Sequence, residues 1–165
     1  MKSVILVRHA KSDWNDPSLK DFDRPLNDRG KRDAPLMAHR LLDKKIKLDA
    51  LISSPAKRAK KTAELFAKEF DKDKNDIFFI DELYLAEPPV FFDVISKVDN
   101  DYKTIAIFSH NDGITKFANQ LCDVRIDDIP TCGVFAVKAD IKKWKEFSEA
   151  EREFWFFDSP KSNAG

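Results

Sequence analysis

The feature that most constrains the fold is the apolar run at residues 3–7, SVILV, which leads directly into Arg8 and His9. A short, continuous apolar run with β-branched residues is typical of a strand that is buried on both faces. The run therefore predicts a buried strand. Its abrupt end raises the question of what two ionisable side chains do at that point.

Further apolar runs and helical repeats alternate along the rest of the chain. Strands are predicted at residues 48–54, 76–81 and 103–109, and a closing β-hairpin at residues 133–139 and 151–158. Apolar residues at helical spacing predict helices over about residues 27–43, 54–70, 91–98 and 113–122. This alternation favours a three-layer α/β/α sandwich, with a mostly parallel central sheet and an antiparallel C-terminal edge.

Two helix starts are indicated by local pattern. Asn27 is a suitable N-cap for the first helix. Ser54 and Pro55 have the pattern of an N-cap followed by the first helical position of the second helix. In that case Arg58 lies in the first turn of the second helix.

The chain length of 165 residues fits one domain, and we expect a single domain over residues 1–159 with a flexible tail at 160–165. The 29 lysines and arginines balance 29 acidic residues, which argues against a general nucleic-acid or membrane-surface role. No apolar run is long enough for a membrane span.

Two observations bear on the compartment. Arg8 interrupts the apolar N-terminal stretch too early for a signal peptide. The two cysteines, Cys122 and Cys132, fit free thiols in a reducing environment better than a disulfide framework. We therefore expect a cytoplasmic protein with no membrane or nucleic-acid partner.

Two arginines and two histidines fall at one edge of the predicted sheet. Arg8 and His9 end the first strand, His110 follows the fourth, and Arg58 begins the helix after the second. In parallel sheets, ligands bind beyond the carboxyl ends of the strands. We therefore expect these four side chains to converge on one pocket.

Phosphoryl transfer is the chemistry that suits such a set. Arginine offers a planar fork of donors for phosphate oxygens, and a helix N-terminus also favours an anion. A neutral histidine can attack phosphorus and hold the phosphoryl group, and nearby arginines should lower its pKa. A metal site is disfavoured because no carboxylate or cysteine lies at ligand spacing from His9 or His110. We expect no metal and no cofactor.

Four segments resemble, in order, the motifs of the histidine phosphatase, or phosphoglycerate-mutase-like, superfamily. They are LVRHAKSDWN, RPLNDRGKRDA, SSPAKRAKKTAE and FSHNDGI, which together cover residues 4 to about 118. The short chain and the forms RHAKS and DRPLNDRG are most similar to SixA-type phosphohistidine phosphatases. The resemblance implies the histidine phosphatase fold, here without a large cap.

The resemblance also implies roles for the four converging residues. His9 is the nucleophile that becomes phosphorylated. Arg8 and Arg58 clamp the phosphoryl oxygens. His110 completes the pocket by donating to the phosphoryl group as charge develops.

Three further residues are assigned by the resemblance alone. Asn15 matches an asparagine that contacts phosphate. Glu82 aligns with the acid that protonates the leaving group in many relatives, and Glu87 is a nearby rival for that role. Such an acid matters less when the leaving group is the imidazole of a phosphohistidine.

Departures from the mutase pattern point to the class of substrate. Ala10, Lys11 and Asn111 replace the glycine, glutamate and glycine of mutases. The segment between Leu83 and Val90 is short, so the site should be open. The expected reaction is hydrolysis of a phosphohistidine on a protein, with inorganic phosphate as product. Two alternatives stay open: a phosphomonoesterase acting on a sugar phosphate or nucleotide, and a non-catalytic phosphohistidine-binding module.

Overall fold

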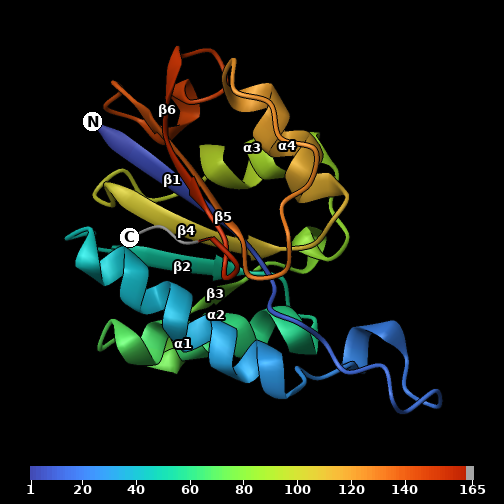
Figure 1. Ribbon diagram of the computed structural model, residues 1–165. Helices are drawn as coiled ribbons and strands as arrows, with labels where there is room; N and C mark the ends of the chain where they lie inside the picture. The colour runs from blue at the N-terminus through green and yellow to red at the C-terminus, as the bar shows by residue number, and fades with distance from the viewer. Residues whose placement is uncertain (163–165) are drawn as a thin grey trace.

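A six-stranded sheet runs through the centre of the computed structural model, which describes residues 1–162 (Figure 1). The spatial order is β3-β2-β4-β1-β5-β6. Neighbours from β3 to β1 are parallel, whereas β5 is antiparallel to both β1 and β6. The strands are β1 (Lys2–Arg8), β2 (Ala50–Ser53), β3 (Phe78–Phe79), β4 (Thr104–Ser109), β5 (Val134–Ala139) and β6 (Arg152–Asp158).

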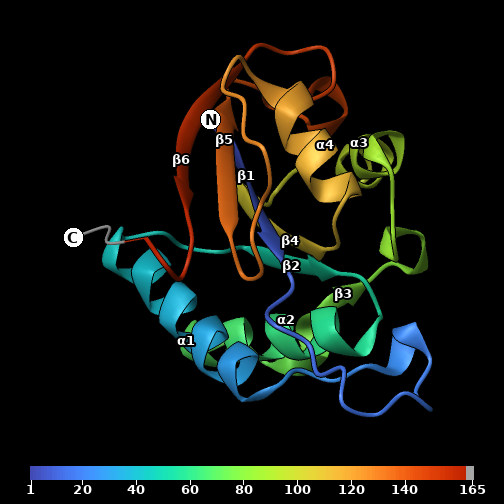
Figure 2. The same ribbon diagram turned by 45° about the vertical axis from the view of Figure 1, so that its right-hand side comes forward.

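Helices cover both faces of this sheet. Figures 1 and 2 show α1 and α2 on one face and α3 and α4 on the other. The predicted three-layer sandwich with an antiparallel C-terminal edge is therefore confirmed. The helices are α1 (Asp28–Asp43), α2 (Lys57–Glu69), α3 (Pro88–Ser96) and α4 (Gly113–Leu121). Four short 3-10 turns complete the fold: η1 (Asp21–Asp23), η2 (Lys74–Asp76), η3 (Asp81–Leu83) and η4 (Trp144–Glu146).

The apolar run in β1 contributes to two cores at once. Val4 and Leu6 pack in the core under α3 and α4, whereas Ile5 and Val7 pack in the core under α1 and α2. All four are fully buried, which explains why the run has no polar alternation. Since successive side chains of a strand point to opposite faces, Arg8 is expected to face α4 and His9 to face α2.

Two local predictions differ from the structure. The strand expected at residues 76–81 is reduced to Phe78–Phe79, an edge strand whose side chains are both exposed. The prediction that Ser54 and Pro55 start the second helix is wrong, because α2 begins at Lys57 with Ala56 as its N-cap. The Ser54 hydroxyl has a tertiary partner instead, which is described below.

The start of α1 ties the long 10–27 loop to the body of the protein. The Asn27 side chain accepts a hydrogen bond from the Gly30 amide at 2.9 Å, so the predicted N-cap is confirmed. A Cβ atom at Gly30 would lie 2.3 Å from the Lys11 carbonyl oxygen. Only glycine permits this approach, which brings α1 against the first residues of the loop.

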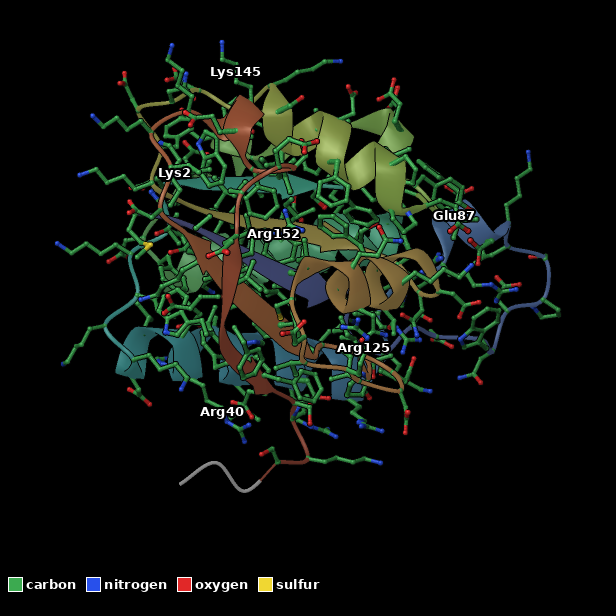
Figure 3. The ribbon with its side chains drawn as sticks, turned by 90° about the horizontal axis from the view of Figure 1, so that it is seen from above. Lys2, Arg40, Glu87, Arg125, Lys145 and Arg152 are labelled. Atoms are coloured by element: carbon green, nitrogen blue, oxygen red, sulfur yellow. The ribbon has the colours of Figure 1, made fainter. Side chains whose placement is uncertain are left out.

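The segment that follows β6 lies against α1. The Arg40 guanidinium, labelled in Figure 3, donates to the carbonyl oxygens of Ser159 at 2.7 Å and Pro160 at 3.4 Å. Residues 163–165 of the expected tail lie outside the described residues, so the flexibility of the tail at 160–165 stays a prediction. Among residues 1–162, no helix is long and apolar enough to cross a membrane.

Candidate active site

The structure brings the predicted arginines and histidines together at the carboxyl edge of the sheet. Arg8 pairs in register with Ser109, the residue before His110. The ring centroids of His9 and His110 are 5.2 Å apart. Arg58 enters from the first turn of α2, and its Nε lies 3.3 Å from Nε2 of His9. The ends of β1 and β4 and the first turn of α2 thus bring His9, His110 and Arg58 side by side.

The hydrogen bonds of His9 define which ring nitrogen carries the proton. Nδ1 lies 2.8 Å from the carbonyl oxygen of Ala10, which can only accept, so Nδ1 holds the proton. The Nε–H of Arg58 donates to Nε2, so Nε2 carries no proton and its lone pair accepts this hydrogen bond. This tautomer is assigned from the hydrogen-bond network. It is the form needed by a histidine that attacks through Nε2.

The surroundings of His9 keep its ring neutral. Burial, followed by the positive charges of Arg58 and Arg8, lowers the pKa of His9 to about 4. The predicted effect of the arginines is confirmed in direction, although burial is the larger cause. At neutral pH the lone pair on Nε2 is therefore not lost to protonation.

The backbone around His9 is held on several sides. The His9 amide donates to the Ser109 carbonyl at 3.1 Å, and the Cys132 amide is shared between the carbonyls of Arg8 and His9. The Ala10 amide donates to Oγ1 of Thr62 at 3.0 Å, and that hydroxyl donates to the Arg58 carbonyl. These bonds join β1 to β4 and α2, so the nucleophile candidate has a fixed position.

His110 has one paired and one unpaired ring nitrogen. Nε2 lies 2.8 Å from the hydroxyl oxygen of Ser54, which also accepts from the Ala56 amide at 3.2 Å. Since a hydroxyl can both donate and accept, the Ser54 hydroxyl can donate to Nε2, and in that tautomer the His110 proton lies on Nδ1. Nδ1 is buried and has no partner among residues 1–162. An arriving oxyanion would supply one.

Electrostatics also favour a neutral His110. Burial, followed by the interaction with the neighbouring His9 ring and the positive charge of Arg58, lowers the pKa of His110 to about 3. Two neutral rings and two permanent guanidinium cations therefore share the site at neutral pH. Such a site favours an anion and contains one uncharged nucleophile.

Arg8 is anchored by the connection between α4 and β5. Its NH1 donates to the Ile129 carbonyl at 2.8 Å and lies 3.5 Å from Oδ2 of Asp128. Its Nε is buried without a partner in the described part of the chain. One N–H of Arg8 is thus free for a ligand while the guanidinium stays tethered.

Arg58 is held by two residues that the sequence pattern did not identify. Its terminal nitrogens donate to the carbonyl oxygen and the carboxylate of Asp21, at 2.7 and 3.0 Å. The Tyr84 hydroxyl donates to the same carboxylate oxygen at 2.5 Å. Asp21 lies three residues before the segment RPLNDRGKRDA, and Tyr84 lies two residues after Glu82. An acid in an acid-rich loop and a tyrosine in a short connection follow no periodic pattern.

The other three candidate residues lie apart from this group. Asn15 is exposed in the 10–27 loop, and only its backbone amide forms a hydrogen bond, to Asp13 at 2.8 Å. Glu82 is exposed and lines a cavity of about 610 Å³ beside β2, β3 and α3. Glu87, labelled in Figure 3, lies at the surface, and its Oε2 is 3.4 Å from Nζ of Lys116. No hydrogen bond within residues 1–162 joins any of the three to the histidines.

The side-chain set suits anion chemistry rather than metal binding. Throughout residues 1–162, no group of three or more His, Cys, Asp or Glu side chains is placed to hold a metal ion. The arrangement can bind a phosphoryl group through guanidinium and imidazole N–H donors and accept it on a neutral nitrogen.

Comparisons with known proteins agree on one family. The Histidine phosphatase superfamily (branch 1) profile matches residues 4–83. An uncharacterized chloroplastic protein of Arabidopsis thaliana is 31% identical over 155 residues, which are 88% of this chain and 70% of the relative.

Solved structures give the same fold. The putative phosphohistidine phosphatase SixA of Agrobacterium tumefaciens superimposes with a TM-score of 0.80 at 24% identity, covering 96% of this chain and 98% of the other. The protein histidine phosphatase SixA complexed with tungstate superimposes with a TM-score of 0.81 at 20% identity, covering 96% and 97%. At these identities the likeness establishes the fold alone.

Proposed function

Because the chain belongs to the histidine phosphatase superfamily, we propose that it is a phosphatase that transfers a phosphoryl group to Nε2 of His9 and then to water. The observation that carries this proposal is the unprotonated Nε2, buried and facing the Nε–H of Arg58. A rigid, neutral nitrogen beside a guanidinium is suited to attack phosphorus and to stabilise the product.

The first step moves the phosphoryl group from the substrate to the enzyme. The Nε2 lone pair of His9 forms a bond to phosphorus, and the bond from phosphorus to the leaving group breaks. Arg8 and Arg58 neutralise the phosphoryl oxygens, and the Nδ1–H of His110 donates to one of them. When the substrate is a phosphohistidine whose other ring nitrogen is protonated, breaking the P–N bond releases its histidine as neutral imidazole. No general acid is then needed.

The second step restores the enzyme. Water attacks phosphorus, and the electron pair of the P–N bond returns to Nε2 of His9. The proton lost by water passes to the phosphate or to solvent, and inorganic phosphate leaves. No step requires a metal or a cofactor, and Glu82 and Glu87 are not needed as acids. A phosphate contact by Asn15 remains a prediction.

The proposed substrate class is a phosphohistidine on the surface of a protein. The connection from η3 to α3 spans only residues 84–87, so this segment is too short to form a cap over the site. An open site admits a side chain that projects from a folded partner. The two SixA proteins, a putative phosphohistidine phosphatase and a protein histidine phosphatase, support the same substrate class.

A substrate panel tests this function. Initial rates would be measured on a phosphohistidine-bearing protein, phosphoserine, a sugar phosphate and a nucleotide, with the native protein and His9→Ala. We expect the phosphohistidine protein to be hydrolysed fastest, with loss of activity in His9→Ala. Faster hydrolysis of a small ester would favour the phosphomonoesterase. Binding of the phosphohistidine protein without turnover would favour the binding module.

A further inference from the structure

Asp21 and Tyr84 form a support for Arg58 that lies outside the group of residues expected to contact phosphate. We infer that Asp21, held by the Tyr84 hydroxyl, is a positioning residue that fixes the Arg58 guanidinium for attack by His9. The inference rests on the proposed function. It assigns to the 10–27 loop a task in the reaction, performed through Arg58 rather than by contact with the reacting atoms.

The Arg58 guanidinium has two edges with different partners. Asp21 occupies the end of the fork, with its carbonyl oxygen 2.7 Å from NH1 and its carboxylate 3.0 Å from NH2. The side edge, formed by Nε and NH2, is directed at His9, with Nε 3.3 Å from Nε2. A guanidinium has five N–H donors, so the bonds to Asp21 leave donors on the side edge for phosphoryl oxygens.

Because Arg58 is buried, its orientation depends on the hydrogen bonds to Asp21. The Arg58 side chain is only 5% exposed, so water cannot readily satisfy a terminal nitrogen that loses its partner. An unpaired buried donor is costly, and the guanidinium would rotate to find another acceptor. Rotation would move the Nε–H away from the position at which the phosphoryl group forms on His9.

Tyr84 fixes the carboxylate from the other side. Its hydroxyl lies 2.5 Å from the same Oδ2 that accepts from Arg58. Its ring meets those of His110 and Phe22 edge to face, with centroids 5.4 and 5.1 Å apart. The Asp21 carboxylate therefore has two charge-assisted donors and a packed neighbour, although it comes from an irregular loop.

The charge states suit a permanent clamp. Burial acts to raise the pKa of Asp21, but hydrogen bonds from Tyr84 and Arg58 outweigh it, so that this pKa lies below its ordinary value. Burial and the Asp21 carboxylate raise the pKa of Tyr84, which keeps its donor proton. Asp21 is thus ionised at neutral pH, as an anchor for Arg58 must be.

The position of Tyr84 follows from the packing of α4 on the connection that carries it. A Cβ atom at Gly113 would lie 1.6 Å from the Ala86 carbonyl oxygen. Glycine at the first position of α4 therefore lets the 84–87 connection approach the helix that follows His110. This approach brings the Tyr84 ring to the histidine and its hydroxyl to Asp21.

The chain provides a matched control two residues away. Asp23 lies in the same 3-10 turn, is exposed, and makes no side-chain hydrogen bond among residues 1–162. Asp21→Asn and Asp23→Asn remove the same charge from the same turn. Only the first removes the negative charge from a hydrogen-bond partner of Arg58, since an asparagine oxygen can still accept but is uncharged. A general effect of charge or loop stability would appear in both variants.

The experiment follows phosphorylation of His9 by phosphoramidate, a small donor that needs no protein docking, by 31P NMR. Melting temperatures and inhibition by vanadate are measured in parallel. Asp21→Asn should lower the rate at saturating donor about 10- to 100-fold and weaken vanadate inhibition, whereas Asp23→Asn should stay within about twofold. Tyr84→Phe, which removes only the hydroxyl, should lower the rate about threefold. Asp23→Asn should keep the native melting temperature, and the other two variants should lie within about 5 °C of it.

The outcomes separate this inference from the function on which it rests. No phosphorylation of His9 in the native protein would contradict the proposed function itself. A native protein that is phosphorylated, with Asp21→Asn equal to Asp23→Asn, would overturn the positioning role alone. Faster phosphorylation or tighter vanadate inhibition in Asp21→Asn would also overturn it, because Asp21 would then compete with the phosphoryl group. If Asp21→Asn fails to fold, an unchanged rate in Tyr84→Phe overturns the inference, and a reduced rate at an unchanged melting temperature supports it.

Discussion

The carboxyl edge of the sheet and the 10–27 loop both reach the candidate site, but they are built differently. At the edge, His9 and His110 are nearly buried and their backbones follow paired, parallel strands. The loop projects from the body in Figure 1, and Trp14 and Phe22 are exposed within it. In the proposed mechanism the edge supplies the reacting groups, whereas the loop supplies two hydrogen-bond acceptors on Asp21 that orient Arg58. Changes at the edge should therefore abolish the reaction, and changes in the loop should tune it.

The largest expected effect is at the edge. His9→Ala removes the proposed nucleophile, so phosphohistidine hydrolysis should fall by about 10⁴-fold or more. The measurement is the initial rate of phosphate release from a phosphohistidine-bearing protein. His39→Ala is the control, because His39 is exposed on α1 and pairs with Glu69 at 2.8 Å. Equal rates in the two variants would contradict the nucleophile assignment.

The next effect tests the fork of Arg58. Arg58→Lys keeps the positive charge but loses the planar edge that faces His9, so the hydrolysis rate should fall about 100-fold. Lys57→Ala changes the adjacent exposed residue of α2 and should have little effect. Native hydrolysis rates in Arg58→Lys would mean that a positive charge at this position is sufficient for the reaction. The proposed orientation of Arg58 by Asp21 would then be irrelevant.

The pH dependence tests the burial of the edge. The pKa of His9 is about 4 in the folded protein and near 6.5 in an unfolded chain, so the unfolded state takes up a proton first as pH falls. The free energy of unfolding should be unaffected by His9 above pH 6.5 and should decrease by up to about 3 kcal/mol between pH 6.5 and 4.

Urea unfolding at pH 7 and pH 4.5 measures this effect, with His9→Asn as the comparison. The native protein should lose more stability than the variant over that interval. The hydrolysis rate should stay independent of His9 protonation down to about pH 5. A rate that falls near pH 6.5 would show that His9 titrates as an exposed histidine does.

The smallest expected effect concerns the two acids that lie outside the site. Glu82→Gln and Glu87→Gln should each change phosphohistidine hydrolysis by less than about twofold, since neither carboxylate contacts the histidines. The same pair should be assayed on a sugar phosphate. A large loss on the phosphohistidine protein would restore a general acid to the mechanism.

The contrast between edge and loop also explains what the sequence could predict. Strand ends follow from apolar runs, and the carboxyl ends of parallel strands share an edge, so Arg8, His9 and His110 were predictable. The position of Arg58 was predictable because it lies in the first turn of α2, the helix that follows β2. Each of these inferences needs only local pattern and one rule of topology.

The remaining features depend on tertiary contacts that no local pattern contains. Ser54 has the pattern of a helix N-cap, yet its hydroxyl pairs with His110 because the end of β2 lies beside the end of β4. Asp21 and Tyr84 are separated by 63 positions and meet only because a loop and a short connection fold over the same arginine. Such contacts become visible only in three dimensions.

The most direct test of the central claim is the identity of the phosphorylated atom during turnover. Native protein with 15N-labelled histidine would be mixed with a phosphohistidine-bearing protein, quenched rapidly in alkali and examined by 31P NMR. We expect a phosphorus signal coupled to Nε2 of His9 in the native protein and no such signal in His9→Ala. Phosphorus bound to Nδ1 or to another residue, or hydrolysis without any phosphorylated enzyme, would contradict it.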